Sequence, residues 1–593
     1  MTQGIVVGIT ANLITVEMNG SISQNEIAYV CNGDERLMSE VIRITGKTAY
    51  TQCFESTRGI KIGLPVEFSG RMLEVELGPG LLSKNYDGLQ SDLNKKKGLF
   101  LKKGEYTSAL NEETMYEFVA FATVGERIHA GFWLGEVKEN WVEHKIMAPF
   151  DLMGEWTVES VAASGAYSIR DVIAVIRNEA GERLELTMTH RWPVKIPIRA
   201  YREKCRPFRL METGYRIIDT FNPLAEGGTG FIPGPFGSGK TVVQHAISKN
   251  ASADIIIVAA CGERANEVVE IFTEFPELDD PRTGRKLFER TTIICNTSNM
   301  PVAAREASVY TAMTIGEYYR QMGLSVLLLA DSTSRWAQAL REMSNRLEEL
   351  PGPDTFPMDL PAIIANFYAR AGVVYLHNGA SGAVTFLGTV SPAGGNLKEP
   401  VTESTKKVAQ SFYALSQKRA DSKRYPAIDP HESYSKYLRS PEIQQFLTER
   451  SGSTWVNDVL SLKNRMLRGK EAQDQISILG DDGVPIGYHV DFWKSELIDA
   501  ALIQQDAFDP VDRFASVERQ EYGLKKVKKI CDREFNFQAF EAVAPYFKKI
   551  INSLKQMNFC EFNSVQFKEF EAQFKSILNE EPNAEQSLSE GTH

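Results

Sequence analysis

Gly234-Pro235-Phe236-Gly237-Ser238-Gly239-Lys240-Thr241 matches in full the phosphate-binding loop pattern G-x-x-x-x-G-K-[ST]. Glycines in this pattern let the backbone turn closely around phosphate oxygens, so that successive N–H groups and the start of the next helix face the anion. The lysine adds positive charge near the β- and γ-phosphates, and the threonine adds a hydroxyl for Mg²⁺. The eight residues therefore predict a nucleoside triphosphate site.

The sequence on either side of the loop fits a strand followed by a helix. Apolar Phe231 and Ile232 precede it, and Val242, Val243 and Ile247 follow it at helical spacing. The same letters in another context would also suit a glycine-rich turn with a surface lysine. A strand before the loop and a helix after it favour the phosphate site.

The bulk composition predicts a large protein of several domains. The chain has 593 residues, of which 43% are apolar. It has no apolar run long enough to span a membrane and no secretory leader at its start, so we expect it neither to span a membrane nor to be secreted by itself. Seven scattered cysteines with no C-x-x-C pair argue against a disulfide framework and a zinc site, and favour a reducing cytoplasm. The net charge of -11 gives no general affinity for nucleic acid or anionic lipid.

The first third of the chain is written as β structure. We predict an N-terminal β-barrel over 1–77, in which the strand 14–18 ends at the hairpin signal Asn19-Gly20. Residues 78–199 mix glycine-rich turns with further β-like runs and end in a proline-punctuated stretch. We predict that they form a linker and an inserted β-rich lobe.

The remainder changes to α/β and then to helical patterns. Over 200–435, apolar runs at 255–260, 292–295, 326–330 and 373–376 alternate with helical segments, which is typical of a buried, mainly parallel sheet. One such helix, 303–322, is expected to stop at Gly323. We predict a phosphate-loop nucleotide-binding core over 200–435, a helical domain over 436–580 and a disordered tail over 581–593. The fold class is multidomain α/β.

Two of the apolar runs end in a carboxylate. The run at 255–260 leads to Cys261-Gly262-Glu263-Arg264, and the run at 326–330 leads to Asp331. Ligands of open α/β sheets lie beyond the carboxyl ends of the strands. We therefore expect Glu263 and Asp331 beside the phosphate loop.

Each of these residues has a chemical role and a plainer alternative. Asp331 could hold Mg²⁺ directly or through its water, or cap the helix that follows. Glu263 could polarise an attacking water, or be an ordinary surface glutamate. Arg264 and Arg335 could stabilise charge on the transferred phosphoryl group, or form structural ion pairs.

Several strings together resemble the catalytic A subunits of V-type and archaeal-type rotary ATPases, also called V-type ATP synthase alpha chains. They are IDTF from Ile218, GPFGSGKTVVQ from Gly234, CGERANE from Cys261, ADSTSRWAQALRE from Ala330, RLEELPG from Arg346 and SPAGGNLKEPVT from Ser391. The resemblance runs from near residue 1 into the C-terminal helical region. It also accounts for the lobe near 110–190 as the insertion that separates these subunits from F-type β chains.

The resemblance implies a role for each matching position. Lys240 and Thr241 bind phosphate and Mg²⁺, Glu263 orients the lytic water and Asp331 serves Mg²⁺. The other implied site residues are the phosphate-facing Arg264 and Arg335, Glu267 near the Mg²⁺ water shell, and the adenine-contacting aromatics Tyr425 and Phe508. For the two aromatics, ordinary core packing is the alternative.

The resemblance also implies an assembly. Mg²⁺ would be the cofactor and ATP and ADP the substrate and product, with hydrolysis or synthesis coupled to transport of H⁺ or Na⁺. Three such chains would alternate with three non-catalytic B subunits, joined by central and peripheral stalk subunits to a membrane sector, so that the chain is cytoplasmic and peripheral to the membrane. The alternatives from the same core are a hexameric export or secretion ATPase and a non-catalytic nucleotide-binding scaffold subunit. No nucleic acid partner is expected.

Overall fold

The computed structural model describes residues 2–95, 106–235, 237–298 and 300–579. Of these, residues 2–95, 106–207, 226–233, 253–298 and 300–409 form one compact unit, and residues 208–225, 234–235, 237–252 and 410–579 form a second. Phe236 and the predicted tail 581–593 lie outside the described residues. None of the seven cysteines, all of which lie in the described ranges, forms a disulfide. In the described part of the chain, no helix combines the length and apolarity that crossing a membrane requires.

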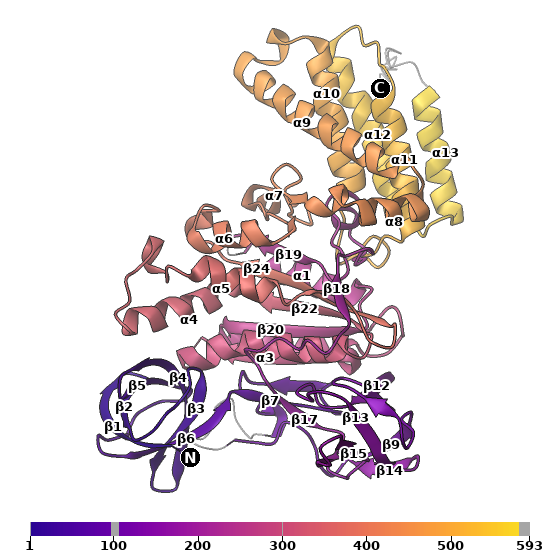
Figure 1. Cartoon of the computed structure of the whole chain (residues 1–593). Coiled ribbons are helices and arrows are strands. Elements are labelled where there is room, and N and C mark those ends of the chain that lie inside the picture. Colours follow the sequence, from indigo (N-terminus) through magenta and orange to yellow (C-terminus); the bar gives the residue numbers. More distant parts are fainter. Residues whose placement is uncertain (1, 96–105, 236, 299, 580–593) are drawn as a thin grey trace. The chain divides into compact units, whose positions relative to one another are not determined.

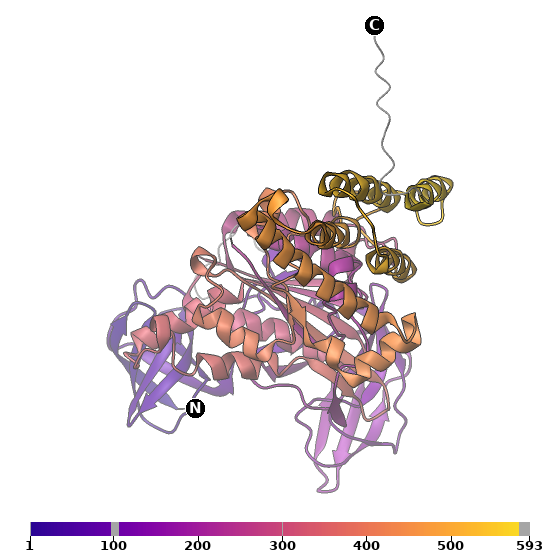
Figure 2. The ribbon, with the colours of Figure 1, turned by 90° about the horizontal axis from the view of Figure 1, so that it is seen from above.

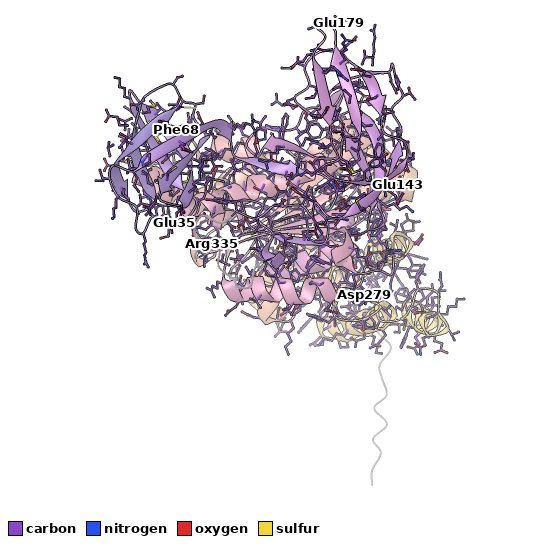
Figure 3. All side chains as sticks on the ribbon, turned by 90° about the horizontal axis from the view of Figure 1, so that it is seen from below. Glu35, Phe68, Glu143, Glu179, Asp279 and Arg335 are labelled. Atoms are coloured by element: carbon purple, nitrogen blue, oxygen red, sulfur yellow. The ribbon has the colours of Figure 1, made fainter. Side chains whose placement is uncertain are left out.

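The N-terminal residues form a closed barrel, as predicted. Inward-facing apolar side chains fill it, and Phe68 is fully buried there (Figure 3). Neighbouring strands follow the order β1-β2-β5-β4-β3-β6. The barrel strands are β1 (Gln3–Thr10), β2 (Leu13–Met18), β3 (Glu26–Asn32), β4 (Glu35–Thr45), β5 (Thr48–Cys53) and β6 (Pro65–Met72).

The hairpin expected at Asn19-Gly20 is wrong. β2 pairs with β1 and β5, whereas the next strand, β3, pairs with β4 and β6. A turn signal reports local backbone preference only, and barrel closure sends the chain past its neighbour to another strand.

The inserted lobe consists of two four-stranded antiparallel sheets. In Figure 1 the barrel is the indigo body at the lower left and the lobe is the purple body at the lower right. One sheet has the order β10-β13-β15-β16, the other β12-β11-β9-β14, and β17 pairs with β7 beside them. These strands are β7 (Glu74–Leu77), β9 (Met115–Ala120), β10 (Arg127–Ile128), β11 (Trp133–Glu139), β12 (Val142–Met147), β13 (Trp156–Val161), β14 (Gly165–Ser168), β15 (Ala174–Asn178), β16 (Arg183–Leu186) and β17 (His190–Pro193).

A parallel sheet is the centre of the first unit. Its strands lie in the order β19-β24-β22-β20-β21-β8, and each neighbouring pair is parallel. Every residue of the apolar run 255–260 is buried, as continuous apolar text predicts for a strand covered on both faces. The strands are β8 (Lys84–Tyr86), β19 (Thr229–Pro233), β20 (Ile255–Glu263), β21 (Thr291–Thr297), β22 (Ser325–Asp331) and β24 (Ser381–Val390).

The run at 373–376 is an exception to the parallel pattern. It forms β23 (Gly372–Tyr375), which is antiparallel to β24 and to β18 (Glu203–Cys205). The strand that completes the parallel sheet is β24, whose sequence the apolar pattern did not single out. A short connection from β23 to β24 allows only antiparallel pairing, because a parallel partner needs a long crossover.

Helices pack against this sheet. Helix α3 lies along β20, β21, β22 and β24 (Figure 1) and ends at Arg320, and Gly323 has a positive φ of 78° close to the predicted stop. The helices of the unit are α2 (Ala265–Glu274), α3 (Val302–Arg320), α4 (Thr333–Arg346), α5 (Leu360–Tyr368) and α6 (Pro400–Val408). Its short 3₁₀ turns are η1 (Leu93–Lys95), η3 (Phe275–Glu277), η4 (Leu287–Arg290), η5 (Pro353–Thr355) and η6 (Ala393–Gly395).

The second unit is mainly helical, as predicted for the C-terminal region. Its long helices run side by side, with α9 packed on α10 and α12 packed on α13 (Figures 1 and 2). Its α-helices are α1 (Lys240–Asn250), α7 (Gln417–Asp421), α8 (Pro441–Ser451), α9 (Trp455–Leu479), α10 (Ile486–Leu497), α11 (Val517–Asp532), α12 (Val543–Asn558) and α13 (Val565–Asn579). Its shorter elements are the π-turns η2 (Ile217–Phe221) and η9 (Ile498–Ile503), the 3₁₀ turns η7 (Lys436–Arg439), η8 (Asp481–Gly483) and η10 (Phe540–Ala542), and the strand pair β25 (Ser411–Phe412) and β26 (Tyr434–Ser435).

Candidate functional site

The phosphate loop has the backbone that its glycines predict. It joins the end of β19 at Pro233 to the start of α1 at Lys240. Gly237 and Gly239 have φ values of 78° and 87°, a left-handed conformation that favours glycine. Gly239 is the N-cap of α1, so the N–H groups of the first turn of α1 point toward the loop.

Two side chains, those of Lys240 and Ser238, form hydrogen bonds with backbone carbonyl oxygens of the loop. The Lys240 Nζ donates to the carbonyl oxygens of Gly234 at 2.8 Å and Pro235 at 3.0 Å, and the Ser238 Oγ donates to the same Pro235 oxygen at 2.8 Å. A Cβ built on Gly234 would lie 2.6 Å from the Ser238 Oγ and 2.8 Å from the Leu415 Cβ, so only glycine fits there. These contacts bring the Lys240 ammonium group to the carbonyl oxygens of Gly234 and Pro235, beside the N-terminal turn of α1, which suits a phosphate group.

Thr241 lies in the first turn of α1 and is partly exposed. Its hydroxyl makes no hydrogen bond to any residue whose position the structure gives, which leaves the oxygen available to a cation. Among the same residues there is no cluster of three or more His, Cys, Asp or Glu side chains able to hold a metal. Mg²⁺ in phosphate-loop proteins needs only one or two protein oxygens, because substrate phosphates and water supply the rest. The donor set present therefore fits Mg²⁺ bound together with a nucleotide.

The two predicted carboxylates lie at the carboxyl ends of neighbouring parallel strands. β20 ends at Glu263 and β22 ends at Asp331, and the two strands pair through Ala260 and Asp331. The Thr389 Oγ1, on the next strand β24, donates to the Asp331 Oδ1 at 2.6 Å. Sequence reasoning missed Thr389, although the apolar text of 383–390 before the SPAGG string was a usable signal.

A bulge redirects the end of β20. The register with β21 shifts between Cys261 and Glu263, and Gly262 between them has a φ of 79°. A Cβ on Gly262 would lie 3.2 Å from the Arg335 Cβ, so the bulge brings the strand end close to the first turn of α4. In Figure 3, Arg335 is labelled on the same side of the first unit as Glu35, which belongs to the barrel, whereas Glu179 lies at the far tip of the lobe.

The surroundings of Glu263 raise its pKa well above that of an ordinary glutamate. Burial, the charge of Asp331 and a hydrogen bond with Glu267 raise its pKa to about 8, while the Arg335 guanidinium lowers it. Glu267, in the first turn of α2, is thus brought together with Glu263, Asp331 and Arg335. A carboxyl whose pKa lies near neutrality is suited to exchanging a proton with water.

The two arginines have different surroundings. The Arg335 Nη1 donates to the Gln338 Oε1 at 3.1 Å, one helical turn further along α4. Arg264 is exposed at the N-terminal end of α2. Both therefore remain candidates for contact with substrate, Arg335 from within the carboxylate cluster.

The two aromatic candidates lie in the second unit and are not packed in its core. Tyr425 is 48% exposed and Phe508 is 84% exposed. The Gln505 backbone N–H donates to the Tyr425 carbonyl at 2.8 Å, which ties the segment before Phe508 to the segment that carries Tyr425. Exposed rings of this kind are free to stack on a planar ligand.

Three family matches cover much of the chain. Residues 6–97 match the ATP synthase alpha/beta family, beta-barrel domain. Residues 107–195 match the ATP synthase alpha/beta subunit barrel-sandwich domain, and residues 214–435 match the ATP synthase alpha/beta family, nucleotide-binding domain.

Relatives that match nearly the whole chain identify a more specific group within this family. The V-type ATP synthase alpha chain of Borrelia duttonii is 49% identical over 97% of this chain and 98% of its own length. The V-type ATP synthase alpha chain of Treponema denticola is 48% identical over 98% and 97% of the two chains. The assembled ATPase EscN of the enteropathogenic E. coli type III secretion system has a similar fold, with a TM-score of 0.59 at 20% identity, covering 88% of this chain and 100% of that one. The chain belongs to the ATP synthase alpha/beta family, among its V-type ATP synthase alpha chains.

Proposed function

We propose that this chain hydrolyses or synthesises ATP with Glu263 as the residue that orients the water and exchanges its proton. The observation that carries the proposal is the cluster of Glu263, Asp331, Glu267 and Arg335 at the carboxyl edge of the sheet, in which the pKa of Glu263 is raised to about 8. In hydrolysis, water attacks the γ-phosphorus, the bond to the β,γ-bridging oxygen breaks and Glu263 takes a proton from the water. Synthesis is the reverse, and Glu263 then returns the proton.

The other candidate residues bind the nucleotide or stabilise the charge that develops during phosphoryl transfer. Backbone N–H groups of Gly237, Ser238 and Gly239 and the Lys240 ammonium hold phosphate oxygens, because Lys240 can exchange its two carbonyl acceptors for phosphate. Arg264 and Arg335 stabilise charge that develops on the transferred phosphoryl group. Tyr425 and Phe508 stack on adenine. Thr241 would hold Mg²⁺, Asp331 would serve it directly or through a bound water, and Glu267 would lie near its water shell, so that the ion neutralises phosphate charge.

The family places the chain in a multisubunit complex associated with a membrane. We infer that it alternates with non-catalytic B subunits in a hexamer, on the cytoplasmic side, and that stalk subunits couple its reaction to transport of H⁺ or Na⁺. An arginine supplied by the neighbouring subunit would add roughly 10³ to 10⁵ in rate, as in related phosphate-loop enzymes, so the isolated chain should turn over slowly.

The two alternatives have less support. The likeness to the secretion ATPase EscN extends to the fold alone, since the identity is 20%. A non-catalytic scaffold would not need the complete set of Lys240, Glu263 and Asp331. Near-full-length relatives at 49% identity favour the V-type enzyme.

Glu263→Gln tests the proposal in the assembled complex. Because glutamine keeps the shape but cannot take a proton, we expect nucleotide affinity within about threefold of the parent and ATP turnover reduced at least about 10²-fold. The binding control is Lys240→Ala, which should lose affinity and turnover together. Turnover of Glu263→Gln at the parent rate would remove Glu263 from the reaction.

Purification of the tagged Glu263→Gln chain from its native cells tests the assembly. Co-purification of a related chain without a phosphate loop, together with stalk and rotor chains, would identify the rotary complex. Secretion components in their place would favour the export ATPase.

A further inference from the structure

The first unit contains a basic pocket that is lined by none of the candidate site residues. It has a volume of about 630 Å³ and lies between the linker 195–204, the C-terminal half of α3 and the end of α5. Five cationic side chains and one carboxylate line it, namely Lys195, Arg199, Lys204, Arg320, Arg370 and Glu317. This excess of positive charge stands out in a chain whose net charge is -11.

Two of the five cations have a carboxylate oxygen within hydrogen-bond distance. The Lys195 Nζ lies 2.9 Å from the Glu40 Oε1 and 3.4 Å from the Glu306 Oε2. Arg370 grips Glu317 with two hydrogen bonds, of 3.0 and 2.6 Å. Glu317 also accepts the Ile198 backbone N–H at 2.9 Å, so its oxygens are largely committed.

Arg320 is buried without a full set of partners. Its side chain is 2% exposed, and its nearest carboxylate oxygen, on Glu317, lies 3.8 Å away. Its Nη atoms donate to the carbonyl oxygens of Arg370 and Ile198, but its Nε has no hydrogen-bond partner. A buried, unpaired donor on a charged group costs free energy, and an anion in the pocket would remove that cost.

Arg199 and Lys204 add charge at the same place. Both are exposed, and neither forms an ion pair with a carboxylate in the ranges that the structure describes. The Lys204 Nζ donates to the Ala369 carbonyl oxygen at 2.5 Å. Partial burial of its ammonium group and the nearby charges of Arg320 and Arg199 lower the pKa of Lys204 to about 8, against the opposing charge of Glu317, as expected where cations outnumber carboxylates.

We propose that this pocket binds a small phosphorylated anion, held by Arg199, Lys204 and the buried Arg320. Phosphate oxygens match the guanidinium fork of arginine, and a diphosphate would supply enough negative charge for three cations. The half-buried ring of Tyr201, with Arg320 5.5 Å from its centroid, fixes one wall of the pocket. Inorganic diphosphate and the phosphate tail of a nucleotide share this chemistry, and the experiment separates them.

Calorimetry with inorganic pyrophosphate on the full chain tests the site, in a Lys240→Ala background that disables the phosphate loop. We expect saturable binding that weakens as salt rises, and a loss of affinity of at least about tenfold in Arg199→Ala/Lys204→Ala. The matched control is Arg177→Ala/Lys138→Ala, which removes two exposed cations of the lobe and should leave affinity unchanged. ATP binding more tightly than pyrophosphate would identify a nucleotide as the ligand, and equal affinity would identify the phosphate group alone.

Chemical labelling gives a second measurement that needs no variant. Acetic anhydride should modify Lys204 more slowly when pyrophosphate is present, whereas modification of Lys138 should be unaffected. The proposal is overturned if pyrophosphate fails to bind the Lys240→Ala chain, or if it binds equally well without Arg199 and Lys204. Neither outcome would bear on ATP turnover by Glu263.

Discussion

Glu263 and Asp331 could be found from the sequence because each ends a buried apolar strand. Parallel strands end at the same edge of a sheet, so two such carboxylates must lie near each other. Thr389 was missed for the opposite reason. Its strand contains Gly382 and Gly388, which interrupt the apolar text, yet a Cβ on Gly382 would lie 2.0 Å from the Arg320 carbonyl oxygen. Close packing against α3 thus requires glycine at position 382, and this glycine weakens the apolar pattern by which the strand could be recognised.

Removing the Thr389 hydroxyl should impair the Asp331 carboxylate that it holds. Thr389→Val keeps the side-chain shape but loses the 2.6 Å hydrogen bond, worth about 1.5–3 kcal/mol to a charged acceptor. If Asp331 serves Mg²⁺, the Mg²⁺ concentration for half-maximal ATPase activity should rise several-fold. A titration of activity with Mg²⁺ checks this, and Thr389→Ser should restore the parent value. An unchanged Mg²⁺ requirement would separate Thr389 from the metal.

The raised pKa of Glu263 also predicts how stability depends on pH. Its pKa is about 8 in the folded chain and near 4.5 when unfolded, so the native state binds the proton more tightly. The stability that this proton contributes is present below about pH 4.5 and is lost as the pH rises through 8. Glu263→Gln should therefore raise the melting temperature relative to the parent at pH 9 and have little effect at pH 5. Glu179→Gln, at the exposed tip of the lobe, is the control and should follow the parent throughout.

At the scale of elements, periodicity and apolar runs predicted the barrel, the parallel sheet, α3 and the C-terminal helices. The local sequence could not predict which strands pair with one another. The hairpin signal at Asn19-Gly20 was overridden by barrel closure, and β23 reads like its neighbours although it runs antiparallel to β24. Pairing depends on contacts distant in sequence, whereas turn and strand preferences are local.

The phosphate loop allows an element-scale test of backbone conformation. Gly239→Ala places a side chain at a φ of 87° in open space, so the cost is conformational strain of about 1–2 kcal/mol with no steric clash. Relief of that strain moves the N-cap of α1, and we expect nucleotide affinity to fall at least about tenfold. Fluorescence titration with a labelled nucleotide measures it.

Gly46→Ala is the matched control, because Gly46 has a φ of 58° and equally open surroundings in a barrel turn. It should cost similar stability and leave nucleotide affinity unchanged. Equal losses of affinity in both variants would mean that the effect is global destabilisation.

At the scale of the whole molecule, a buried polar network fastens the lobe to α3. Glu139, on β11, accepts the backbone N–H groups of Gly80 and Leu82 at 2.8 Å each. It also pairs with His144, 2.6 Å away, and accepts the Tyr319 hydroxyl of α3 at 3.1 Å. Burial alone would raise the pKa of Glu139, but His144 and the amide donors outweigh it and lower the pKa. No motif marks this network, because its members come from separate stretches of the chain.

Glu139→Gln should destabilise the protein by about 3–5 kcal/mol at neutral pH, since it leaves buried partners of a charge unsatisfied. The folded pKa of Glu139 is depressed, so the stability it contributes is present above about pH 4.5 and is lost as the pH falls through the folded pKa. The difference between variant and parent should thus shrink in acid. Urea unfolding across pH measures it, with the exposed Glu143→Gln as control.

Because the two units are interleaved in the sequence, the second unit cannot be completed during synthesis until the end of the chain is made. The phosphate loop and α1 belong to the second unit, whereas β19 before them and β20 after them belong to the first. The rest of the second unit starts at Gln410, roughly 160 residues after the segment with α1 has ended at Ser252. At about 5–20 residues per second, that interval lasts roughly 8–30 s. The phosphate loop is thus synthesised early, and it lacks most of the unit to which it belongs until the C-terminal helices leave the ribosome.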